Sequence, residues 1–291
     1  MNNIVEVKHV VKGFKDKVVL NDISFSMKPG EIVGFVGQNG AGKSTLMKCM
    51  CNLIDVDSGS ISICGKDVAK QREQALASIS CMIEGPGLFE NMTGKENLEL
   101  IATLNHVSKD KLTEMMDFTQ IGSQLKTKSV SKYSMGMKQR TGLAVALMKN
   151  PKVLLLDEPM NGLDATGIQN LREELTHLSK EKNVALLISS HQLGEIEKIA
   201  DRIIGIHFGK IKEISMNGKE NIYTLETDKP IQNISVFRIL EQNGNMYKLE
   251  VDSVMDVLAN LENQGLKVKN ITQVHKTLED VYNEFIREAS S

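Results

Sequence analysis

The chain has 291 residues, of which 41% are hydrophobic and 25% charged, and its net charge is −2. This length supports one large core, or a main domain with a smaller second one. The near-neutral charge gives no electrostatic reason to expect nucleic-acid binding. We see no signal peptide and no run of 18 apolar residues, so we expect no membrane span in this chain. The cysteines lack C-x-x-C spacing, which argues against a zinc site and favours buried thiols in a reducing environment. They are Cys49, Cys51, Cys64 and Cys81.

The first part of the chain reads as strands followed by a helix. Apolar and polar residues alternate over 4–28, which predicts antiparallel strands. A tight turn then leads into a short, wholly apolar segment that ends at a glycine-rich loop. The elements expected here are antiparallel strands over 4–28, a buried strand over 32–36, a helix over about 43–53, and strands at 61–64 and 79–83.

A helical stretch follows, and we expect it to form a subdomain over about 88–150. Thr93 with Glu96 three residues later forms a capping box at the start of its first helix. Ser108 opens a second helix. A third runs over about 136–149 and stops before Pro151, because proline disfavours helix in the residue that precedes it.

The second half of the larger domain alternates strands with helices. Its strands are continuously apolar, which indicates a parallel sheet covered on both faces. Near residue 215 the pattern changes. We expect a turn at 216–221, short alternating segments at 222–226, 234–239, 246–251 and 267–272, and helices at about 253–264 and 277–287. We therefore predict a main domain over 1–215 and a small α+β accessory domain over 220–291.

The glycine-rich loop GQNGAGKS matches the pattern G-x-x-x-x-G-K-[ST]. Glycines let the backbone approach an anion closely, and successive N–H groups at a helix N-terminus then point at it. Lys43 would reach the terminal phosphates, and the Ser44 hydroxyl would bind Mg²⁺. The plain alternative is a glycine-rich turn with a lysine on its rim. The candidate nucleotide-binding residues are Gly37, Asn39, Gly40, Ala41, Gly42, Lys43, Ser44 and Thr45.

Two acids end a buried strand in VLLLDEP. Asp157 lies at the carboxyl end of that strand, where open α/β sheets bind ligands, and is suited to hold Mg²⁺. Glu158 follows and is a candidate general base for an attacking water. Two solvated acids at a strand end are the alternative, but the upstream phosphate loop favours one phosphoryl-transfer site.

The segment YSMGMKQR is a second candidate anion site. Ser134 and Gly136 precede or begin an amphipathic helix, so a hydroxyl, backbone N–H groups and the positive end of the helix dipole face one way. Taken alone, an ordinary N-capping serine explains Ser134 as well.

Several motifs occur in one order, and together they resemble the ATP-binding subunits of ABC transporters over nearly all of 1–215. GQNGAGKST resembles the Walker A loop, YSMGMKQR the signature motif, VLLLDEP the Walker B strand, NGLDA the D-loop and SSH the switch-histidine motif. The resemblance implies a P-loop NTPase of α/β class, with an antiparallel β subdomain and a helical subdomain, that hydrolyses ATP with Mg²⁺.

The resemblance also implies a homodimer in which two copies pair head to tail around shared ATP. Phe14 occupies the place of an aromatic that stacks on adenine, although a half-buried strand residue is the alternative for it. Asp164 would contact the partner copy. His191 would touch the γ-phosphate, or would otherwise be a solvent-exposed residue at a strand end. The signature residues that would face the partner's ATP are Tyr133, Ser134, Met135 and Gly136.

One residue departs from the family pattern. Glu84 stands where the family normally has a glutamine that touches Mg²⁺ and the attacking water. A carboxylate brings negative charge near the metal, so we expect Glu84 to be a metal ligand, unless it is a tolerated isostere on a loop with a mechanical task. The surrounding IEGPGLFENMTGKENL resembles the bacitracin-transport and lantibiotic-immunity branch, as does the ending HKTLEDVYNEFI.

The resemblance implies the ATPase subunit of a bacterial exporter, lying at the cytoplasmic face of the membrane beneath a separate permease. Its branch implies antimicrobial-peptide immunity or resistance. The alternative is a soluble, ATP-switched interaction protein without a permease. Against it, the chain has one set of motifs rather than two cassettes, and no long coiled-coil insertion.

Overall fold

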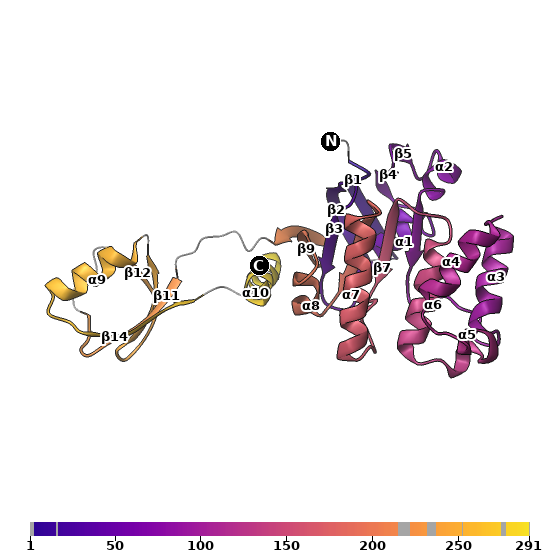
Figure 1. Ribbon diagram of the computed structural model, residues 1–291. Coiled ribbons are helices and arrows are strands. Elements are labelled where there is room, and N and C mark those ends of the chain that lie inside the picture. The colour runs from indigo at the N-terminus through magenta and orange to yellow at the C-terminus, as the bar shows by residue number, and fades with distance from the viewer. Residues whose placement is uncertain are drawn as a thin grey trace. The chain divides into compact units, whose positions relative to one another are not determined.

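The computed structural model divides the chain into two compact units, a larger one of Met1–Ile214 with Phe285–Ser291 and a smaller one of Ser215–Glu284 (Figure 1). The sequence places 285–291 in the accessory domain, whereas here these residues group with the larger unit. The structure describes residues 3–15, 17–214, 222–231, 237–251, 253–274 and 278–290.

An antiparallel sheet forms one layer of the larger unit. Its strands lie in the order β2-β1-β4-β5, and β1 pairs with both β2 and β4. The alternating pattern of the sequence is explained by burial, since Val5, Val7 and Val10 face the core. The bounds are β1 Val5–Phe14, β2 Lys17–Met27, β4 Ser58–Ile63 and β5 Lys66–Asp67.

A six-stranded sheet forms the second layer, in the order β10-β9-β3-β8-β7-β6. Its strands are parallel except for β10, which returns antiparallel to β9. Strands β3, β7 and β8 are buried at every residue, which explains their continuous apolar character. The bounds are β3 Ile32–Val36, β6 Ile79–Met82, β7 Val153–Asp157, β8 Ala185–Ser190, β9 Arg202–His207 and β10 Lys210–Ile214.

Helix α1 (Lys43–Met50) lies between the two sheets. Leu46, Met47 and Met50 are fully buried in one apolar cluster that includes residues of both sheets. In Figure 1, α7 lies in front of the six-stranded sheet and α1 behind it. The glycine-rich loop that precedes α1 is thereby held by a packed helix. The other helices of this part are α2 Arg72–Leu76, α7 Ala165–Lys180 and α8 Leu193–Glu197.

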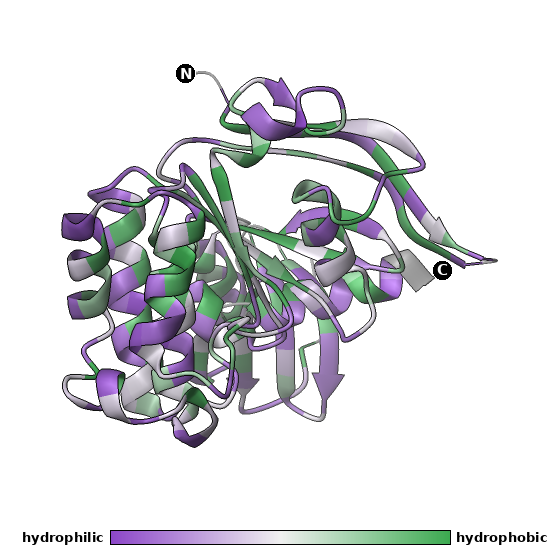
Figure 2. Cartoon of the chain, turned by 90° about the vertical axis from the view of Figure 1, so that its right-hand side faces the viewer, coloured by the Kyte–Doolittle hydropathy of each residue, from purple (hydrophilic) through white to green (hydrophobic). Residues whose placement is uncertain are grey.

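The chain between β6 and β7 forms the helical subdomain. The predicted capping box is confirmed, because the Thr93 hydroxyl accepts from the Glu96 N–H and the Glu96 carboxylate accepts from the Thr93 N–H. These helices carry apolar and polar residues together, which Figure 2 shows as mixed green and purple ribbons. The bounds are α3 Gly94–Leu104, α4 Lys109–Phe118, α5 Gln124–Thr127, a 3-10 turn Val130–Lys132, and α6 Met135–Leu147.

The smaller unit is an antiparallel sheet in the order β12-β13-β11-β14 with helix α9 on one face. Val257 and Leu261 of α9 pack on a sheet core that includes Tyr247 and Leu249. The predicted turn at 216–221 and the start of the predicted strand at 234–239 lie outside the described residues. The bounds are β11 Ile222–Thr227, β12 Phe237–Asn243, β13 Met246–Val251, α9 Val254–Asn263, β14 Val268–Val274 and α10 Leu278–Ser290.

Among the described residues, the structure contains no helix with the length and apolar character needed to cross a bilayer.

Candidate functional site

The glycine-rich loop joins β3 to α1 and needs its glycines for two physical reasons. Gly42 has φ +113°, a region that side chains disfavour. At Gly37, an added Cβ would lie 2.6 Å from the Ile206 side chain, so β9 leaves no room for one. Ala41 donates its N–H to the Gln38 carbonyl at 3.2 Å, which closes the turn through Asn39 and Gly40. Lys43, Ser44 and Thr45 then form the first turn of α1.

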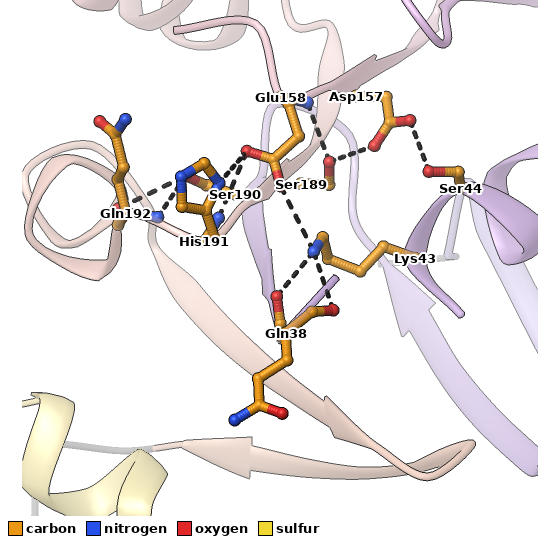
Figure 3. Close-up of polar contacts among 10 residues, drawn as sticks. Gln38, Lys43, Ser44, Asp157, Glu158, Ser189, Ser190, His191 and Gln192 are labelled. Carbon is orange, nitrogen blue, oxygen red and sulfur yellow. Dashed lines mark hydrogen bonds and ion pairs between the residues drawn. The ribbon is translucent and has the colours of Figure 1, made fainter. Parts of the chain in front are cut away.

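Lys43 is buried and folds back over its own loop (Figure 3). Its Nζ donates to the Gly37 carbonyl at 2.6 Å and to the Gln38 carbonyl at 3.4 Å. The same Nζ lies 3.3 Å from Glu158 Oε1. The loop therefore places a buried cation where an incoming phosphate would compete with carbonyl and carboxylate oxygens for it.

Ser44 and Asp157 come together from segments 113 residues apart, with Ser44 Oγ donating to Asp157 Oδ2 at 2.6 Å. Ser189 supplies the other hydrogen bond, from its Oγ to Asp157 Oδ1 at 2.5 Å. The sequence did not single out Ser189. A sequence signal for Ser189 was available, because Ser189 lies at the carboxyl end of β8, the strand next to β7.

Glu158 follows β7 in the left-handed region, at φ +50°. Its N–H donates to Ser189 Oγ at 2.9 Å, and its Oε2 lies 2.8 Å from His191 Nδ1 (Figure 3). Glu158 therefore bridges Lys43 on one side and His191 on the other. This brings together the residues that the sequence proposes for water activation and γ-phosphate contact.

The ion pair found for Glu84 is with Lys48, and not with Ser44 or Asp157. The Glu84 carboxylate is 68% exposed and pairs with Lys48 Nζ of α1 at 2.5 Å. The structure thus shows a salt-bridge partner for Glu84 that sequence reasoning missed. Lys48 lies five residues after Lys43. A glutamine, which the family usually has in place of Glu84, could not neutralise the positive charge of Lys48.

Phe14 ends β1 with its side chain 46% exposed, as a surface available for stacking requires. Lys12 Nζ lies 5.4 Å from the ring centroid. Asp57 fixes this strand end, because its carboxylate accepts from Lys12 Nζ and from the Gly13 N–H, both at 2.7 Å. These bonds lower the pKa of Asp57, with the Lys12 hydrogen bond as the main cause.

The structure corrects the expectation for the Tyr133 side chain. Tyr133 is only 7% exposed, and its hydroxyl accepts from the Gly94 N–H at 3.1 Å and donates to the Gln124 carbonyl at 3.4 Å. The ring is therefore buried within the helical subdomain, where these partners hold its hydroxyl, and its side chain is not presented to solvent. Ser134 caps α6 by accepting from the Met137 N–H at 3.3 Å.

The remaining signature and D-loop residues share one surface. Met135 is exposed and lies beside Gly162. A cavity of about 320 Å³ is lined by Ser134, Gly136 and Asp164, among others. Asp164 also caps α7, because its Oδ1 accepts from the Gly167 N–H at 2.8 Å.

The donor set at Ser44 and Asp157 fits magnesium, which prefers hard oxygen ligands and usually retains several waters. One hydroxyl and one carboxylate oxygen, 2.6 Å apart at the start of α1, match that preference. Among the described residues, no group of three or more His, Cys, Asp or Glu gathers as a protein-only metal cage. A metal here would therefore need water and phosphate oxygens to complete its coordination.

Comparison with known proteins agrees with this geometry. The family model described as ABC transporter matches residues 20–161. The bacitracin transport ATP-binding protein BcrA of Bacillus licheniformis is 35% identical over 303 residues, covering 98% of each chain. The chain belongs to the family of ABC transporter ATP-binding proteins.

Two further proteins are similar to this chain. The lantibiotic transport ATP-binding protein SrtF of Streptococcus pyogenes is 35% identical over 223 residues, covering 76% of this chain and 95% of SrtF. A dimeric post-hydrolysis structure of the ATP-binding cassette MJ0796 with ADP and Pi has a TM-score of 0.65 at 22% identity. It covers 72% of this chain and 99% of that one, and it shows the shared fold.

The predicted fold class is therefore confirmed: a P-loop NTPase core of α/β class with antiparallel and helical subdomains. This ABC ATP-binding protein is the ATP-binding subunit of a transporter and hydrolyses ATP, as its membership of the family implies. The bacitracin- and lantibiotic-transport resemblance is also confirmed, at about 35% identity.

Proposed function

We propose that this ABC ATP-binding protein powers a bacterial exporter that protects the cell from an antimicrobial peptide of the bacitracin or lantibiotic type. The observation that carries the proposal is the 35% identity to BcrA over nearly the whole of both chains. The relatives' names are transport names, so they lend no support to an ATP-switched protein without a permease.

We propose the following roles in ATP hydrolysis. Lys43 and the backbone N–H groups of the P-loop bind the phosphates, and Ser44 and Asp157 would hold Mg²⁺. When bound, that ion would neutralise charge on the phosphate oxygens. Glu158 accepts a hydrogen bond from the attacking water and orients it. His191, 2.8 Å from the Glu158 carboxylate, contacts the γ-phosphate.

Two copies would form the complete catalytic unit. Ser134, Met135, Gly136 and Asp164 would meet the partner's nucleotide and P-loop, as the shared cavity of Ser134, Gly136 and Asp164 supports. Phe14 would stack on adenine. Such a dimer would lie at the cytoplasmic face of the membrane, bound to a separate permease through the helical subdomain.

The proposal is tested by measuring the peptide resistance that this chain and its permease confer together. The chain would be expressed with the membrane protein encoded beside it in a sensitive host, and growth would be measured in bacitracin and in a lantibiotic. We expect resistance that Lys43→Ala abolishes while the protein remains folded. Equal sensitivity with and without the pair to both peptide classes would overturn the proposed substrate. Failure of the two proteins to co-purify would overturn the proposed partnership.

A further inference from the structure

The turn between β9 and β10 carries an aromatic residue in an unfavourable backbone position. His207 and Lys210 are paired, so the loop consists of Phe208 and Gly209 alone. Their φ angles are +44° and +72°, as in a type I′ turn. The first position of that turn favours Asn, Asp or Gly, and a bulky side chain there is strained. Such strain calls for a compensating role of the side chain.

Burial does not supply that role. Phe208 is 69% exposed, one of the more exposed large apolar side chains of the described residues. Its ring centroid lies 4.3 Å from that of His207, which supports one side of the ring. A phenylalanine held in this way presents an aromatic surface to solvent.

The turn lies against the P-loop. Ile206, two residues before Phe208, occupies the space that a Cβ on Gly37 would need. Asn21 of β2 donates its N–H to the Gly209 carbonyl at 2.8 Å, which ties the turn to the antiparallel sheet. A cavity of about 200 Å³ is lined by residues 17–19, 38–41 and 207–209. Residues of the P-loop thus form one wall of this cavity, and aromatic side chains form another.

Phe14 borders the same region from the next hairpin. Its Cα is the register partner of Lys17, which lines the cavity. The cavity also contains Val18 and Val19, which add apolar surface next to the phosphate-binding loop. The apolar and aromatic surface lies next to the phosphate-binding loop. This arrangement matches a ligand that joins a polyphosphate to a flat aromatic ring.

We propose that Phe208 is a second contact for the base or ribose of ATP, in addition to Phe14. This inference rests on the proposed nucleotide site. Aromatic side chains bind bases by stacking, with little dependence on hydrogen-bonding pattern. Phe208 therefore contributes affinity for nucleoside triphosphates and none for the phosphate chain alone.

The end of α10 supports this contact. The rings of Phe285 and His207 pack edge to face, with centroids 6.4 Å apart. Phe285 also covers Gly205, where an added Cβ would lie 3.1 Å from its ring. Phe285 is therefore a positioning residue, acting on Phe208 through His207. This gives Phe285 a role at the proposed nucleotide site of the larger unit.

A fluorescence experiment tests the contact directly, because the chain contains no tryptophan. Phe208→Trp introduces a single reporter in the turn, and Phe89→Trp places one at another exposed phenylalanine. We expect Mg²⁺-ATP to change the emission of F208W, and inorganic tripolyphosphate with Mg²⁺ to leave it unchanged. F89W should respond to neither. Calorimetric ATP binding without an emission change in F208W would overturn the proposal.

Affinity measurements give a second, independent test. Phe208→Asn puts a favoured residue into the turn, so thermal stability should be equal or higher. ATP affinity should nevertheless fall roughly five- to 150-fold, the range expected for losing one stacking contact. Tripolyphosphate affinity should be unchanged, and Phe208→Tyr should restore ATP binding. Phe285→Ala should raise the KM for ATP with kcat retained.

The outcomes separate this inference from the nucleotide site on which it rests. Equal ATP affinity in F208N and the unsubstituted protein, or a parallel loss of tripolyphosphate affinity, would overturn the role of Phe208 alone. Lys43→Ala should abolish binding of both ligands. ATP binding that survives this change would instead refute the proposed phosphate site.

Discussion

At the scale of single residues, a few short contacts assemble the ATPase site. Asp157 accepts hydrogen bonds from Ser44 and Ser189, while Glu158 faces both Lys43 and His191. Each acid therefore has a different set of partners, although the two are adjacent in sequence. The Asp157 carboxylate is held by two hydroxyl groups, and the Glu158 carboxylate is held between a cation and an imidazole.

Glu158→Gln should nearly abolish hydrolysis while ATP binding persists. Loss of a positioned general base typically costs 10²- to 10⁴-fold in rate. The substitution also removes the negative charge 3.3 Å from Lys43 Nζ, so the lysine becomes freer to bind phosphate. Phosphate release and calorimetric ATP affinity measure the two effects, and gel filtration with ATP should show a retained dimer. Unchanged steady-state hydrolysis would remove Glu158 from its role.

Ser189→Ala should lower both activity and stability. Hydrogen bonds to charged groups contribute about 1.5–3 kcal/mol, and Ser189 donates one to Asp157 while accepting another from the Glu158 N–H. We expect the free energy of unfolding to fall by that amount and kcat to fall about tenfold. Ser190→Ala is the matched control, because its hydroxyl contacts Gln192 instead. Equal effects of the two substitutions would contradict the prediction.

At the scale of elements, contacts between neighbouring segments fix the loops around this site. Lys48 of α1 reaches Glu84 after β6, and Asp57 before β4 reaches the end of β1. The first contact joins the helix after the P-loop to a separate part of the fold, and the second does the same for the strand that carries Phe14. Substituting the residues that make these contacts should therefore change the position of a loop more than the catalytic chemistry.

Glu84→Gln should retain hydrolysis within a few-fold, because this carboxylate pairs with Lys48. Such an exposed pair stabilises by only about 0–1 kcal/mol, so a double-mutant cycle with Lys48→Met should show little coupling in stability. We expect altered peptide resistance in cells. ATPase assays on all four proteins measure the outcome, and loss of hydrolysis to background in E84Q alone would favour direct metal binding.

Asp57→Asn should reduce stability at neutral pH but not in strong acid. The folded-state pKa of Asp57 is lowered by Lys12, so its contribution is present above the unfolded pKa of about 4 and is lost as pH falls through the lower folded value. Urea unfolding from pH 7 to pH 3 should show the two proteins converging below about pH 4. The KM for ATP should rise because Phe14 follows this strand end. A stability gap that widens in acid would refute the assignment.

At the scale of the whole molecule, each of the two units has its own apolar core. The larger core contains both sheets around α1, and the smaller contains four strands and α9. The apolar clusters are distinct, so a cavity made in one should not weaken the other.

Calorimetry should resolve two unfolding transitions. Leu249 is fully buried in the smaller core, and Leu249→Ala should cost that unit about 2–5 kcal/mol while leaving the other transition in place. ATP at a hundredfold excess over Kd should stabilise the larger unit alone, by about 2.7 kcal/mol. A single transition that responds to both changes would contradict this independence.

Several candidate site residues that the structure brings together were selected from the sequence because one residue type is chemically required there. Lys43, Ser44, Asp157 and Glu158 lie in short motifs whose spacing follows from a strand that ends at a loop. The Tyr133 side chain could not be predicted, because a signature position says nothing about which neighbours bury the ring. Ser189 was missed because its role depends on the strand beside it.

The sequence alone determined the P-loop, the acids after β7, the strand and helix alternation and the family, because these depend on local spacing and periodicity. The tertiary structure decided which distant groups meet: Ser189 with Asp157, Lys48 with Glu84, and Phe285 with His207 beside Phe208. The physical reason is that such contacts depend on strand order and helix packing, which join segments that no motif connects.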